Sequence, residues 1–153
     1  MIGTTLIVGY GNPLRGDDGV GQTVARAFEG EAAIDGVEAV ACRLLTPELA
    51  ERFAAAARVV LVDAAAGREA GDISVVSLQA GPARPARLGH YIDPSELLGM
   101  ARRLYGRSPE AYLVTVGAGS LELGEELSAP VAAALPEVIA TVRRLALQGP
   151  PSA

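Results

Sequence analysis

The sequence predicts one α/β domain over residues 1–147, a three-layer sandwich with a mostly parallel five-stranded sheet and helices on both faces. Five short apolar runs rich in β-branched residues alternate with segments whose apolar residues recur at helical spacing. Strands that alternate with helices pair in parallel through right-handed crossovers. The 153 residues are also enough to bury one hydrophobic core. The tail 148–153 is expected to be disordered.

The five predicted strands differ in how deeply they should be buried. The first is apolar without alternation, which is typical of a strand covered on both faces, and the third is similar and ends on Asp63. The fourth alternates irregularly, which indicates a more exposed position. In chain order they cover residues 4–8, 37–42, 58–63, 73–78 and 111–116.

The predicted helices are marked by their ends. A glycine-rich turn over 9–19 leads into the first, and the third has a capping Asp93 before Pro94 and closes at Gly106. The second opens at Thr46-Pro47 and the last at Ser128-Ala129-Pro130. Residues 80–92 form a loop of a length that is usually functional or mobile.

Composition excludes several classes of function. The net charge is −5 and all thirteen basic residues are scattered arginines, which argues against a nucleic-acid partner. Without a lysine, a Walker-type phosphate loop and a Schiff-base mechanism are impossible. No apolar run reaches the roughly 18 residues of a membrane span, and we expect no export signal, because the first residues lack a basic stretch and a small-residue cleavage site. The single cysteine, Cys42, is expected to be a buried strand residue in a reducing, cytoplasmic setting.

Polar residues gather at the carboxyl ends of the predicted strands, where open α/β sheets bind ligands. Asp17 and Asp18 follow the first strand, Asp63 ends the third, and His90 follows the fourth. An imidazole with two carboxylates is a plausible site for a divalent metal such as nickel or zinc.

Each of these residues also has a purely structural interpretation. Asp17 and Asp18 precede a helix and could cap it, Asp63 could be held by backbone amides, and a lone histidine in a loop is often a surface residue. The glycine-rich turn is no dinucleotide fingerprint, because Leu14 stands where the third glycine belongs. With one histidine and no G-x-S-x-G elbow, covalent catalysis is disfavoured, which leaves attack by metal-activated water.

The sequence resembles the hydrogenase maturation proteases from about residue 5 to 145. The resemblance rests on the opening signature Gly9-x-Gly11-Asn12-x-x-x-x-Asp17-Asp18-Gly19-x-Gly21, with Leu45-Thr46-Pro47-Glu48-Leu49, Val62-Asp63-Ala64, Ser120-Leu121-Glu122-Leu123-Gly124 and Leu127-Ser128. Such enzymes cut a C-terminal extension from the large-subunit precursor of a nickel-iron hydrogenase after nickel insertion, and the substrate's nickel is the recognition element.

The resemblance implies that Asp18, Asp63 and His90 contact the nickel that the substrate carries, while Asp17 supports the loop or helps to position water. The catalytic residues would be Asp17, Asp18 and Asp63, in a monomer that needs no nucleotide cofactor. Two alternatives stay open: a nickel-sensing accessory protein of hydrogenase assembly that does not cut, and a nucleotide-binding module.

Overall fold

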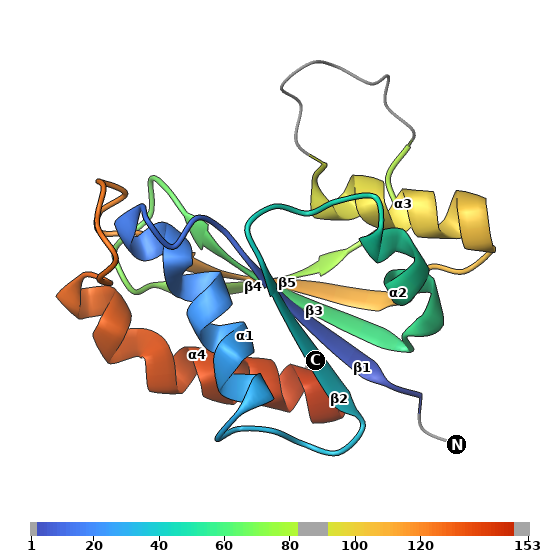
Figure 1. Ribbon diagram of the computed structural model, residues 1–153, viewed down its shortest axis with the longest axis horizontal. Coiled ribbons are helices and arrows are strands. Elements are labelled where there is room, and N and C mark those ends of the chain that lie inside the picture. The colour runs from blue at the N-terminus through green and yellow to red at the C-terminus, as the bar shows by residue number, and fades with distance from the viewer. Residues whose placement is uncertain (1–2, 83–91, 149–153) are drawn as a thin grey trace.

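The computed structural model of the protein describes residues 3–82 and 92–148 and has a five-stranded sheet at its centre (Figure 1). The strand order is β2-β1-β3-β5-β4. The strands are β1 (Thr5–Tyr10), β2 (Val37–Cys42), β3 (Arg58–Ala65), β4 (Ile73–Leu78) and β5 (Glu110–Gly117). The predicted α/β class and the five strands are confirmed.

The sheet is mixed, which qualifies the mostly parallel sheet expected from the sequence. Strands β2, β1, β3 and β5 are parallel, whereas β4 pairs with β5 in the antiparallel direction. Only residues 66–72 join β3 to β4, and a parallel connection needs a dozen residues or more. The expected exposure of β4 is confirmed, since Val75 and Val76 are 41% and 47% exposed.

Helices cover both faces of the sheet. On one face lie α1 (Val20–Glu29) and α4 (Ala129–Gln148), and on the other α2 (Leu49–Ala55) and α3 (Pro94–Tyr105) (Figure 1). Successive residues of a strand point to opposite faces. Accordingly Ile7 joins the core under α1 and α4, whereas Leu6 and Val8 join the core under α2 and α3.

The ends of α3 lie where the sequence predicts them, whereas the start of α2 does not. Asp93 forms a capping box with Glu96 at the start of α3, and Gly106 ends that helix with a φ of 77°. In contrast, α2 begins at Leu49 and not at Thr46, whose carbonyl instead accepts a hydrogen bond from the Leu49 N–H at 3.1 Å in a turn. Of the predicted tail, Gln148 ends α4 and residues 149–153 lie outside the described residues.

The first two crossover connections show which edge of the sheet is expected to bind a ligand. The connection from β1 to β2 runs through α1 on one face, and that from β2 to β3 runs through α2 on the other. The chain therefore changes face beside β1 and β3, whose ends meet where Gly9 pairs with Val62. Such a switch point is where open α/β sheets bind ligands. Within 3–82 and 92–148, no helix has both the length and the apolar character to cross a membrane.

Candidate functional site

Two carboxylates meet at the carboxyl ends of β1 and β3. Asp63 lies near the end of β3 and is partly buried. Asp18 lies in the 3-10 helix η1 (Gly16–Gly19), which contacts β3. The two side chains are close enough that the charge of Asp18 acts on the ionisation of Asp63. The structure thus brings these two predicted site residues together.

Asp63 holds its proton more tightly than an ordinary aspartate. Burial, aided by the negative charge of Asp18, raises its pKa from 3.8 to about 6. Two donors act in the opposite direction: the backbone N–H of Ala64, which donates to Oδ1 at 2.8 Å, and the hydroxyl of Tyr10. With both effects included, the carboxyl group of Asp63 is mostly ionised at neutral pH and takes up a proton at a pH only slightly below neutral.

Tyr10 is a site residue that the sequence analysis missed. It ends β1, and its hydroxyl faces Asp63. Burial first, and then the charge of Asp63, raise the pKa of Tyr10 far above its ordinary value, so the hydroxyl stays protonated and can serve only as a neutral donor. The sequence did contain a signal for this role, because Tyr10 directly follows the first predicted strand and the third predicted strand ends in an aspartate.

Asp18 does not cap a helix. The N-cap of α1 is Gly19, and no side chain caps that helix. Instead the Asp18 Oδ2 atom accepts a hydrogen bond from the backbone N–H of Asn12 at 2.7 Å. No donor among the described residues is bonded to its Oδ1 atom, so that oxygen can bind a ligand at the edge of the sheet.

Asp17 has a different environment, although it is the next residue. It is fully buried, and its carboxylate accepts four hydrogen bonds from the loop after β5. The donors are the backbone N–H groups of Gly119 at 2.6 Å, Ser120 at 3.0 Å and Ser128 at 2.7 Å, and the Ser128 hydroxyl at 2.7 Å. Burial alone would raise the pKa of Asp17, but the bonds from Ser128, Ser120 and Gly119 outweigh it and lower the pKa. Asp17 therefore joins two loops and caps neither η1 nor α1.

Close backbone packing fixes the distance between α1 and the sheet edge. A Cβ atom on Gly21 would collide with the Val62 carbonyl oxygen and would lie 2.7 Å from that of Tyr10. Any side chain at this position would push the start of α1, and η1 with it, away from β1 and β3. The glycines beside the aspartates thus serve a close approach, as the sequence indicated.

His90, the third predicted ligand, lies outside the described residues, so the structure does not place it. Among residues 3–82 and 92–148, no three His, Cys, Asp or Glu side chains are grouped closely enough to hold a metal ion. Cys42 is half-buried and packs against the core under α2 and α3, and burial raises the pKa of its thiol. A protonated thiol agrees with the expected structural role.

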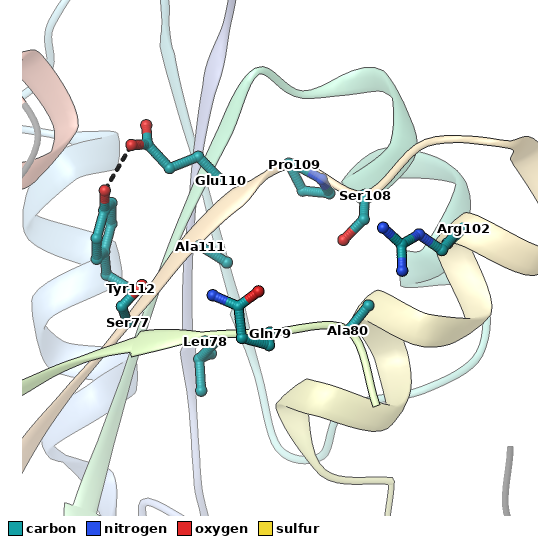
Figure 2. Close-up of a pocket in the computed structure, with 10 residues that line it drawn as sticks. All are labelled: Ser77, Leu78, Gln79, Ala80, Arg102, Ser108, Pro109, Glu110, Ala111 and Tyr112. Carbon is teal, nitrogen blue, oxygen red and sulfur yellow. Dashed lines mark hydrogen bonds between the residues drawn. The ribbon is translucent and has the colours of Figure 1, made fainter. Parts of the chain in front are cut away.

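A cavity of about 410 Å³ opens at Asp18, and its described walls are Asn12, Asp18, Arg43 and Leu44. Figure 2 shows a second hollow, of about 310 Å³, where the side chains of Gln79, Arg102 and Ser108 turn toward one another. It lies at the start of β5, where Leu78 pairs with Ala111, whereas Asp63 pairs with Thr115 toward the other end of that strand. The second hollow is therefore not part of the acidic site.

Fold and site together define a three-layer α/β protein with an acidic site at the switch point of its sheet. Several solved structures that share this fold are hydrogenase maturation proteases. They include HycI of Thermococcus kodakarensis (23% identity, 94% of this chain and 90% of that one, TM-score 0.71). HybD of the same organism is 24% identical over 94% of this chain and 99% of that one, with a TM-score of 0.72. HybD of E. coli is 23% identical over 93% of this chain and 91% of that one, with a TM-score of 0.72. No family model and no curated protein sequence matches the chain. The fold that the resemblance implied is confirmed.

Proposed function

We propose that the protein is an endopeptidase that removes a C-terminal extension from the nickel-loaded precursor of a nickel-iron hydrogenase large subunit. The observation that carries the proposal is that the carboxylates of Asp18 and Asp63 lie close together at the switch point. The fold shared with hydrogenase maturation proteases supports it. The protein would act as a monomer in the cytoplasm and without a nucleotide cofactor.

The substrate's nickel would be contacted by Asp18, Asp63 and His90. Two neighbouring carboxylates repel each other unless a cation lies between them, and neither forms an ion pair within residues 3–82 and 92–148. A divalent ion would relieve this repulsion, and an imidazole would complete a ligand set that suits nickel. The contribution of His90 rests on the family resemblance alone.

Asp63 is also suited to handle a proton. A metal ion lowers the pKa of a bound water enough for attack on an amide near neutral pH. Asp63 would accept a proton from the attacking water and return it to the departing amine, since its carboxylate lies beside the proposed position of the metal. Asp17, whose oxygens are all engaged, would support the loop and touch neither water nor substrate.

The decisive experiment is to incubate the protein with a nickel-loaded precursor and to weigh the products by mass spectrometry. Loss of a C-terminal peptide from the loaded precursor, but not from a nickel-free one, is the expected result. Asp63→Asn should abolish the cut, and Asp35→Asn, the same change at an exposed aspartate, should not. Tight binding of the loaded precursor without any cut would instead favour the accessory protein that senses nickel.

A further inference from the structure

The cavity at Asp18 contains a guanidinium group that the proposed chemistry has not used. Arg43 directly follows β2 and lines this cavity together with Asn12 and Asp18. The carbonyl of Cys42, the residue before Arg43, accepts a hydrogen bond from the Gly11 N–H at 3.2 Å. This bond ties the loop after β2 to the loop after β1, so the position of the Arg43 backbone relative to Asp18 is fixed.

Arg43 forms no ion pair with any residue in 3–82 and 92–148. A guanidinium carries five N–H donors and stays charged at any pH of interest. Its donors are therefore available to a group that enters the cavity.

Asn12 presents a second donor to the same cavity. Its Oδ1 atom accepts a hydrogen bond from the Leu14 N–H at 3.0 Å, and its own backbone N–H donates to Asp18. The side-chain NH₂ group has no bonded partner within 3–82 and 92–148. Arg43 and Asn12 thus both offer donors to this cavity, and such donors suit an oxygen that accepts hydrogen bonds.

We infer that Arg43, assisted by the Asn12 amide, binds the carbonyl oxygen of the peptide bond that is cut. The inference rests on the proposed function. When water attacks the carbonyl carbon, the π electrons of the C=O bond move to this oxygen; they return when the C–N bond breaks and the amine takes up the proton. Negative charge thus develops on this oxygen in the cavity that Asp18 lines, and the guanidinium of Arg43 adds positive charge there to that of the substrate's nickel.

Donors aimed at such an oxygen act mainly in the transition state, so they raise kcat more than they lower KM. An arginine that instead bound an acidic side chain of the precursor would act mainly on KM. The split between kcat and KM therefore distinguishes the two roles of Arg43.

The test measures kcat and KM for cleavage of the nickel-loaded precursor by Arg43→Met, Arg43→Lys and the control Arg52→Met. Arg52 pairs with Glu38 on the surface, so its variant should match the wild type. For Arg43→Met we expect kcat to fall about 100-fold with KM changed less than about threefold, and Arg43→Lys should recover part of the loss. Thermal unfolding of the wild type and both Arg43 variants should be the same, because Arg43 is exposed and forms no ion pair within residues 3–82 and 92–148. Arg52→Met loses only a surface ion pair and should differ little.

Two results would overturn the inference while leaving the proposed function intact: full activity of Arg43→Met, or a loss confined to KM. The second would reassign Arg43 to a substrate carboxylate. If the wild type binds the loaded precursor but never cuts it, the proposed function and the inference both fail.

Discussion

Replacing Asp63 by asparagine should make the protein more stable at neutral pH while abolishing the proposed cleavage of the precursor. The pKa of Asp63 is about 6, against an ordinary value of 3.8. Since one pKa unit corresponds to 1.36 kcal/mol, the ionised side chain destabilises the folded state by at most about 3 kcal/mol above pH 7. Asparagine removes the charge and keeps the oxygen that accepts the Ala64 N–H. Partial exposure and burial of the new amide reduce the expected gain to roughly 1–3 kcal/mol.

The pH dependence of this gain tests its cause. Because the folded pKa is raised, the native state holds a proton that the unfolded chain has lost between about pH 4 and pH 6. Wild-type stability therefore falls relative to the variant as pH rises through this window. The gain should be absent below about pH 4 and complete above about pH 7.

Urea unfolding of wild type and Asp63→Asn from pH 3.5 to pH 8, in the presence of a chelator, measures the difference directly. In a parallel thermal melt near neutral pH, the melting temperature should rise by roughly 2–12 °C, given 2–4 °C per kcal/mol for a protein of this size. Asp35→Asn, at an exposed position, serves as the control and should show no such trend. A variant that is less stable than wild type at pH 8, or a gain that does not change with pH, would refute the reasoning.

Three further substitutions test the rest of the site. Asp17→Asn should lower the free energy of unfolding by about 1–3 kcal/mol at neutral pH, because the new amide cannot accept all four hydrogen bonds. Since folding lowers the pKa of Asp17, urea titrations should show this difference from the wild type shrinking below about pH 4. Asp18→Asn should leave the melting temperature unchanged or slightly raised, because its oxygen can still accept the Asn12 N–H and its charge no longer repels Asp63. Mass spectrometry should nevertheless find no cleavage, and an active variant would contradict the site. Gly21→Ala should cost about 3 kcal/mol in urea unfolding because its Cβ meets backbone atoms.

The sheet was predictable to the extent that its strands carry their own signal. The apolar runs of β1 and β3 indicated buried strands, and Asp63 at the end of one indicated a polar edge. The direction of β4 depends on the length of the connection before it, and the seven residues 66–72 were available for that argument. The mixed sheet could therefore have been predicted from the sequence.

The partners of the site residues were less predictable, because they come from distant parts of the chain. Tyr10 meets Asp63 only because β1 and β3 are neighbours in the sheet, although β2 lies between them in the sequence. Arg43 lines the cavity because β2 pairs with β1 on its other side. Neither contact follows from local spacing, so strand order had to be known first.

The different environments of Asp17 and Asp18 follow from the geometry of a 3-10 helix. With three residues per turn, adjacent side chains point about 120° apart, so one carboxylate of η1 can face the loop after β5 while the other faces the sheet edge. The donors to Asp17 lie 102 to 111 residues away in sequence, which is why capping looked equally plausible from the sequence alone. Because η1 is short and Asp17 is bonded on all sides, a shift of that distant loop must move Asp18 as well. The buried aspartate thus fixes the direction in which its neighbour presents its free oxygen.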